Sequence, residues 1–165
     1  ALAALAARGQ LEDVIVHEMG HVLGLGPSWL LTGRVSDLFD PAYTGPAGVA
    51  AYQELGGNHF VPLENEGAVG TILGHWRESV FGDELMTGYL GARPAIMSRL
   101  TIAALADLGY GVDLSQAEDY SLLITAAARA QGEPDHGDAD DSGHDHGDVP
   151  HSDPIPPFLD GIPGA

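Results

Sequence analysis

The sequence predicts a mainly α-helical domain with irregular loops and a disordered acidic tail. Three observations lead to this prediction: segments with helical periodicity, glycine- and proline-rich stretches between them, and an abrupt change of composition after Gln131. A chain of 165 residues has the length of one domain. We therefore place the domain at residues 1–130 and the tail at residues 131–165.

The first helical segment runs from Leu11 to Leu23 and contains His17, Glu18 and His21. A period of 3.6 residues places the two imidazoles on one face, one turn apart, and this spacing suits two ligands of one Zn²⁺ ion. Glu18 lies about 100° further round the helix, where it is badly placed as a third ligand but within reach of a metal-bound water. It is therefore the candidate general base. The alternative is an amphipathic core helix with two hydrogen-bonded histidines.

Gly24 and Gly26, followed by Pro27, end this helix and let the chain reverse direction. The sequence then has the character of a loop as far as Gly57, with one short helix predicted at Pro46 to Leu55. Residues 56–64 follow a turn and alternate weakly, which predicts a short extended piece.

A further helix is predicted after Ser98, which is a favourable N-cap residue, and it ends before Gly109. A weaker helix is predicted from Ser115 to Ala130. The stripe that the helix after Ser98 should bury consists of Leu100, Ala104, Leu105 and Leu108.

The tail is rich in aspartate, histidine and glycine and has few large apolar side chains before Ile155. Such a segment cannot offset the entropy lost on ordering, so we expect disorder. Its Asp-His clusters are candidates for loose binding of Zn²⁺, Ni²⁺ or Ca²⁺, and the alternative is an acidic solubilising linker.

The composition excludes several functions. The formal net charge is −18, with six arginines and no lysine, so nucleic acid and anionic membranes are poor partners. Zero cysteines exclude a disulfide framework, a thiolate zinc site and a cysteine nucleophile. No apolar run reaches the ~20 residues of a membrane span. The chain begins without methionine or a signal peptide, and we expect it to be a piece of a longer precursor.

A catalytic zinc usually has three protein ligands and one open position. The compact metzincin pattern, H-E-x-x-H-x-x-G-x-x-H, would place the third histidine at the position of Pro27. The ligand must therefore come from elsewhere. Outside the tail, His59 and His75 remain, and Asp37 and Asp40 are carboxylate alternatives.

His75 precedes the sequence Gly82-Asp83-Glu84-Leu85-Met86 by a few residues. Together with the first helical segment, this pattern resembles the C-terminal part of the catalytic domain of leishmanolysin-type zinc metallopeptidases, which belong to the metzincin clan. The resemblance covers about residues 11–113. It implies that the zinc ligands are His17, His21 and His75, that Glu18 is the general base, that Gly24 is the turn glycine and that Met86 forms the methionine turn.

The resemblance also has implications for the fold. It implies a metzincin-like zinc-helix core, but the sheet that precedes the zinc helix in metzincins is mostly missing from this chain. Such relatives carry disulfides, and this chain has no cysteine. Tyr89 is a candidate oxyanion donor or pocket residue, with packing as the alternative.

The expected function is therefore that of a zinc-dependent endopeptidase, in which a metal-activated water attacks the peptide bond and Glu18 is the base. Proteins or peptides would be the substrates, and the resemblance implies an extracellular or cell-surface location. One alternative is a zinc-stabilised, non-catalytic surface or adhesion module. Another is an acidic metal-buffering protein in which the tail is the functional part.

Overall fold

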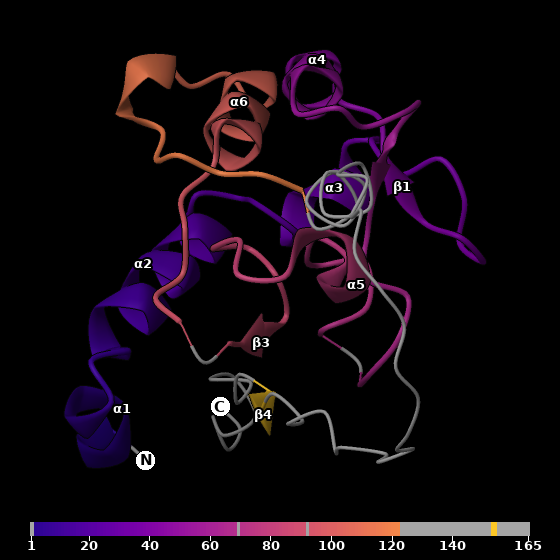
Figure 1. The fold of residues 1–165 in the computed structure, drawn as a ribbon. Helices are drawn as coiled ribbons and strands as arrows, with labels where there is room; N and C mark the ends of the chain where they lie inside the picture. Colours follow the sequence, from indigo (N-terminus) through magenta and orange to yellow (C-terminus); the bar gives the residue numbers. More distant parts are fainter. Residues whose placement is uncertain (1, 69, 92, 123–152, 155–165) are drawn as a thin grey trace, which may run out of the picture.

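The computed structural model describes residues 2–68, 70–91, 93–122 and 153–154. This part of the chain is mainly helical, with irregular loops and two short two-stranded sheets, as Figure 1 shows. The mainly α prediction is confirmed. None of the helices in the described residues has the length and apolar character needed to cross a bilayer.

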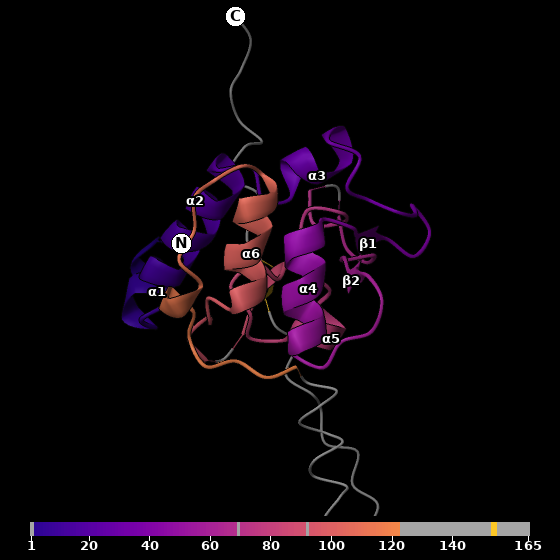
Figure 2. The same ribbon diagram turned by 90° about the horizontal axis from the view of Figure 1, so that it is seen from above.

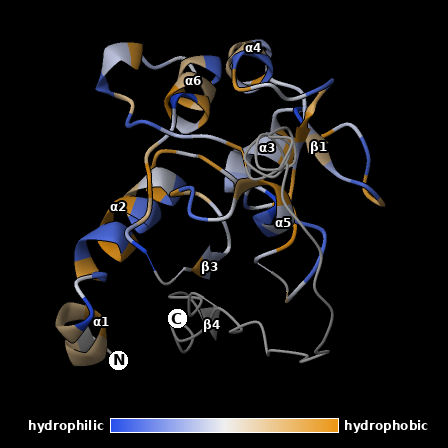
Figure 3. Ribbon diagram, in the orientation of Figure 1, coloured by the Kyte–Doolittle hydropathy of each residue, from blue (hydrophilic) through white to orange (hydrophobic). Residues whose placement is uncertain are grey.

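Two helices begin the chain, α1 (Leu2–Ala7) and α2 (Leu11–Val22). The predicted first helical segment is confirmed as α2, which ends at the glycine turn. Its inner face buries Val14, His17 and Gly20. Its outer face leaves three apolar side chains exposed, and Figure 3 shows hydrophobic and hydrophilic residues along this helix. The exposed residues are Ile15, Met19 and Val22.

A short helix, α3 (Pro27–Leu31), follows where the sequence analysis expected a loop. Gly26 has φ +80°, a conformation that favours glycine, and Pro27 then occupies the first turn of the helix, where its missing N–H is not needed. The expectation of a loop here is therefore wrong. The helix buries Trp29 completely.

The strands β1 (Ala42–Tyr43) and β2 (Val61–Pro62) pair antiparallel, with Tyr43 opposite Val61. In the sequence, α4 (Pro46–Glu54) lies between the two strands. The predicted short helix is confirmed, and the extended piece predicted over residues 56–64 is confirmed only in its second half, because residues 59–60 form a bend before β2.

Helix α6 (Arg99–Asp107) packs beside α4, and Figure 2 shows the two lying side by side. Asp107 connects them, because its carboxylate accepts hydrogen bonds from the Ala47 and Gly48 N–H groups at the start of α4 and from the Tyr43 hydroxyl, each at 2.9 Å. The end of one helix thus caps the beginning of the other.

The predicted buried stripe of α6 is confirmed in its first half. Leu100 and Ala104 are fully buried, while Leu105 and Leu108 are partly buried against the core. Ser98 occupies the N-cap position, but its side chain makes no cap hydrogen bond and instead donates to the buried carboxylate of Glu84. The predicted N-cap position of this serine is therefore confirmed, but its hydroxyl does not cap the helix.

The remaining elements are short. They are α5 (Glu78–Phe81), β3 (Tyr89–Leu90), the 3₁₀ helix η1 (Leu114–Gln116) and β4 (Asp153–Pro154). After η1 the chain to Leu122 is irregular, so the helix predicted from Ser115 is wrong for its described half. Its second half lies outside the described residues, as does the predicted acidic tail except for β4, which pairs antiparallel with β3.

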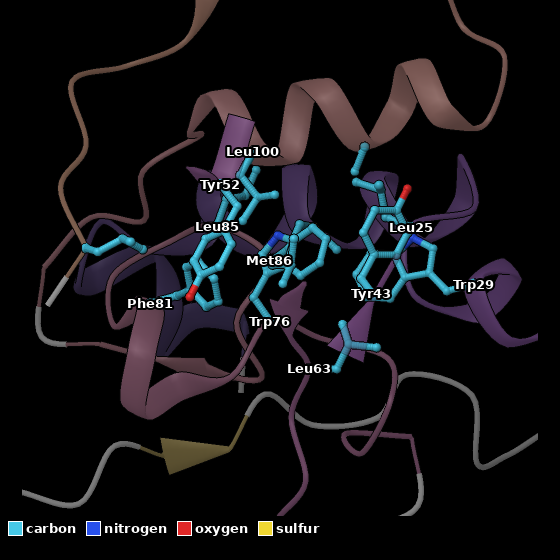
Figure 4. Close-up of a cluster of buried hydrophobic side chains, with 13 residues drawn as sticks. Leu25, Trp29, Tyr43, Tyr52, Leu63, Trp76, Phe81, Leu85, Met86 and Leu100 are labelled. Carbon is cyan, nitrogen blue, oxygen red and sulfur yellow. The ribbon is translucent and has the colours of Figure 1, made fainter. Parts of the chain in front are cut away.

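The core is an aromatic cluster beneath α6. Trp29 and Trp76 stack with ring centroids 4.4 Å apart, and Tyr43 packs on both. Figure 4 shows Met86 beside Trp76 in the middle of the cluster. Since Trp76 directly follows His75, the core fixes the backbone at that histidine.

Candidate metal centre

The first two histidines lie on the inner side of α2. His17 is only 2% exposed, and its Nδ1 lies 2.7 Å from the Leu85 carbonyl oxygen. The Nδ1 of His21 lies 2.9 Å from the Leu25 carbonyl oxygen. That carbonyl lies just beyond the helix and follows Gly24, which has φ +106°.

The third histidine comes from the loop between β2 and α5. The Nδ1 of His75 lies 2.9 Å from the Thr71 carbonyl oxygen, and its Nε2 lies 3.0 Å from Nε2 of His21 and 3.3 Å from Nε2 of His17. The ligand atoms of these three side chains all lie within 4.8 Å of one another. Within the part of the chain that the structure describes, this is the one group of histidine and acidic side chains suited to a metal ion.

The hydrogen bonds determine which nitrogen of each ring carries the proton. A carbonyl oxygen only accepts, so each Nδ1 must be the donor, and each neutral imidazole presents a bare lone pair at Nε2. Three lone pairs that point at one another repel unless a cation lies between them. Tetrahedral zinc–imidazole geometry places ligand nitrogens roughly 3.3 Å apart, and the distances of 3.0 and 3.3 Å fit it. The residues therefore suit a zinc ion.

Burial keeps the His17 and His75 rings neutral. The pKa of His17 is lowered to about 3, chiefly by loss of solvation; the hydrogen bond to the Leu85 carbonyl opposes this shift, and the neighbouring His21 and His75 add to it. Loss of solvation likewise lowers the pKa of His75 to about 4. Since only a neutral imidazole binds a metal, these two buried histidines are in the form that can bind a metal over the whole physiological pH range.

Glu18 follows His17 on α2 and is half-buried. Its carboxylate accepts no hydrogen bond from the part of the chain that the structure describes, so both oxygens remain available to a water or a substrate. This is the state that a general base requires.

The rival third ligands lie elsewhere. His59 is exposed, has φ +59° and lines a shallow pocket with Arg77. Asp40 forms an ion pair with Arg77 at 2.7 Å, and the Asp37 carboxylate accepts a hydrogen bond from the Phe39 N–H. None of these three belongs to the histidine group.

Met86 lies directly beneath α2 and is completely buried. A Cβ at Gly20 would lie 2.7 Å from the Met86 sulfur, so the missing side chain allows the methionine to approach the helix next to His21. The turn that contains Met86 also supplies the Leu85 carbonyl that orients His17. The turn therefore supports the histidine pair from below.

Tyr89 in β3 and His17 line a cavity of about 10 Å³, which has room for about one water molecule. Loss of solvation raises the pKa of Tyr89, and nearby carboxylates, Glu64 first, raise it further. Its hydroxyl therefore stays protonated and able to donate a hydrogen bond.

Sequence reasoning missed several supporting groups. Gly20 gave a signal, because glycine inside a helix is destabilising and often marks a close approach. Thr71 and Leu85 contribute backbone carbonyls, which no side-chain pattern reveals. Glu84 lies in the sequence Gly82-Asp83-Glu84-Leu85-Met86, but its role depends on contacts with Ser98 and Thr101, which are distant in sequence.

Two histidines one helical turn apart and a third from a distant loop form a group that could hold a metal ion, with a buried methionine packed against the same helix. The model of the leishmanolysin family matches residues 5–127. The chain therefore belongs to this family, whose members are zinc-dependent metalloendopeptidases.

Individual relatives agree with this assignment. A leishmanolysin homolog of Crithidia fasciculata is 31% identical over 108 residues, which cover 58% of this chain and 16% of the relative. Leishmanolysin-like peptidases of Caenorhabditis briggsae and Caenorhabditis elegans are each 45% identical over 58 residues, or 34% of this chain and 9% of the relative. The chain thus spans a small part of these relatives. No solved structure matches it significantly.

Proposed function

We propose that the chain carries the zinc centre of an endopeptidase, with His17, His21 and His75 as the ligands and Glu18 as the general base. The observation that carries this proposal is the convergence of three Nε2 atoms, each on a ring whose Nδ1 donates to a backbone carbonyl. A fourth ligand from the described residues is absent from the group. This favours an open, catalytic position over the closed shell of a structural site.

A zinc ion bound there supplies a Lewis acid that polarises the scissile carbonyl and lowers the pKa of water toward ~7. The Glu18 carboxylate takes one proton from the attacking water and delivers it to the leaving amine nitrogen. Both transfers use the same carboxylate, which projects from α2 next to His17. The Tyr89 hydroxyl is the candidate donor to the developing oxyanion.

The remaining features of the proposal follow from the family. Met86 is the apolar floor of the centre and Gly24 the turn glycine, in a metzincin-like core that lacks most of the upstream sheet. The substrates are proteins or peptides, and the enzyme acts at the cell surface or outside the cell. Residues 1–130 form the catalytic core, and the acidic tail is a separate segment.

Replacing Glu18 by glutamine tests the mechanism. We expect Glu18→Gln to retain one zinc per chain and to lose activity on a fluorogenic peptide by about 10²–10⁴-fold, because the amide cannot accept the proton. Glu12→Gln, an exposed position on the same helix, is the matched control and should leave both unchanged.

The ligand assignment is tested on the same preparations by measuring the zinc content. His75→Gln should lose the metal, whereas His59→Gln should retain it. A Glu18→Gln variant that cleaves as fast as the parent would refute the base, and zinc loss in His59→Gln but not in His75→Gln would refute the ligand set.

A further inference from the structure

Glu84 is a charged side chain in an unusual place. It is only 1% exposed and lies between the methionine turn and the first turn of α6. A buried carboxylate is strongly unfavourable unless hydrogen bonds compensate for the lost water. Burial accordingly raises the pKa of Glu84, and hydrogen bonds from Thr101, Ser98 and Met86 oppose this shift.

Four donors surround this carboxylate. One oxygen accepts from the Met86 N–H at 2.6 Å. The other accepts from the Ser98 hydroxyl at 2.7 Å, the Thr101 hydroxyl at 2.5 Å and, at 3.4 Å, the Ser98 N–H. Only a group with two acceptor oxygens can satisfy donors on both sides, so neither glutamine nor an apolar residue of the same size can replace it fully.

These hydrogen bonds lead toward the metal centre along two routes. On one side, the Met86 N–H adjoins the Leu85 carbonyl that accepts from His17. On the other side, the Thr101 hydroxyl accepts from the Trp76 indole N–H at 2.9 Å, and Trp76 follows His75. The Trp76 backbone N–H also donates to the Met86 carbonyl at 2.9 Å, which closes the network.

We propose that Glu84 is a positioning residue for the metal centre: its carboxylate holds the methionine turn and Trp76 in register, so that the Nε2 atoms of His17 and His75 converge. This inference rests on the proposed zinc centre. Two observations make pure packing a poor explanation. First, an apolar side chain would fill the same space without the cost of burying a carboxylate. Second, the Ser98 hydroxyl donates to this carboxylate and does not cap its own helix.

The test is the isosteric variant Glu84→Gln, measured by zinc affinity in competition with a chromophoric chelator. We expect the dissociation constant to rise about tenfold or more, as for other outer residues that orient metal ligands. The visible absorption of the Co²⁺-loaded chain should also change, because the ligand geometry changes. Thermal unfolding of each variant shows whether it is folded.

Asp107→Asn is the matched control. Asp107 is also a carboxylate with three hydrogen-bond donors, but it connects α4 and α6 and has no contact with the histidines. This variant should lose stability while retaining the parental zinc affinity and Co²⁺ spectrum. An equal loss of zinc affinity in both variants would reduce the role of Glu84 to general stability and overturn the proposal.

Thr101→Val is a milder second variant, useful if Glu84→Gln does not fold. It keeps the shape of the side chain and removes the hydroxyl between Trp76 and Glu84. We expect a smaller rise in the dissociation constant and an altered Co²⁺ spectrum. Parental values in a folded Glu84→Gln or Thr101→Val variant would overturn the positioning role alone, whereas a parent chain that binds no zinc would overturn the proposed function.

Discussion

The metal-centre region and the helix pair α4–α6 are held together in different ways. In the helix pair, two regular elements pack along their length and one carboxylate, Asp107, closes the contact. Around the histidines, α2 is the only long element among the described residues. The described chain between β2 and β3 is irregular apart from the single turn of α5, and it is held by backbone carbonyls and by the buried acids Glu64 and Glu84.

This difference shows where each region is vulnerable. A single substitution in a packed helix pair removes only a small part of its stability, because many weak contacts contribute to it. The region around the three histidines depends on a few close approaches and hydrogen bonds, so one local change alters the positions of the imidazoles. Three substitutions test this comparison.

Gly26→Ala should have the largest effect. Gly26 has φ +80°, and an added Cβ would lie 2.2 Å from the Gly74 carbonyl oxygen, next to His75. The α2–α3 turn and the histidine loop would have to separate, at a cost of about 3 kcal/mol or more in unfolding free energy, with loss of zinc binding. Chemical denaturation measures the unfolding free energy, and zinc titration measures the binding of the metal.

The matched control is Gly33→Ala. Its φ is +69°, but an added Cβ would meet nothing within 4 Å. Backbone strain alone predicts a loss of about 1–2 kcal/mol with zinc binding intact. Equal behaviour of the two variants would show that close approach is unimportant at Gly26.

Glu78→Gln should have an intermediate effect that depends on pH. Burial, and then the charges of Glu64 and Asp83, raise the pKa of Glu78 from 4.5 to about 7. Between pH 4.5 and about 7 the folded state keeps a proton that the unfolded state releases. The free energy of unfolding therefore falls as the pH rises through this range. The variant should be more stable than the parent at pH 8, by about 1–3 kcal/mol, and equal at pH 4.

Unfolding free energies across this pH range provide the measurement. Glu54→Gln, an exposed position whose ion pair with Arg99 is 3.4 Å long, should follow the parental curve. A parental slope that persists in Glu78→Gln would assign the titration to another group.

Tyr43→Phe should have the smallest effect. It removes the hydrogen bond to Asp107, which keeps its two backbone donors on α4. We expect a loss of about 1 kcal/mol in unfolding free energy and unchanged zinc affinity. Tyr110→Phe, which removes an exposed hydroxyl bonded to the Leu23 carbonyl, should change stability by less than about 0.5 kcal/mol. A loss of zinc affinity in Tyr43→Phe would contradict the separation of the two regions.

The same difference explains what could be predicted from the sequence. Helices α2, α4 and α6 carry their own periodicity and stop signals, so local pattern was sufficient. The helix expected from Ser115 failed, because its described half forms only a 3₁₀ turn. Helix α3 was missed, since five residues after a glycine turn have too little periodicity.

For the candidate site, spacing alone indicated His17, Glu18 and His21, because one helix carries them. His75 is brought to them by a chain path of more than fifty residues, and only the family resemblance singled it out. Glu84 and the carbonyl partners of the imidazoles could not be predicted, because they depend on contacts between distant segments.

The backbone hydrogen bond between Trp76 and Met86 restricts the length of the chain segment between these two residues. The hydrogen bond from the Trp76 N–H to the Met86 carbonyl fixes both ends of the intervening stretch, so inserting or deleting a residue there would displace either His75 or Met86. Leu38 and Phe39, by contrast, are exposed, and the Phe39 N–H donates only to the nearby Asp37 carboxylate. Insertions and deletions in relatives should therefore be concentrated there and be excluded from the stretch between Trp76 and Met86.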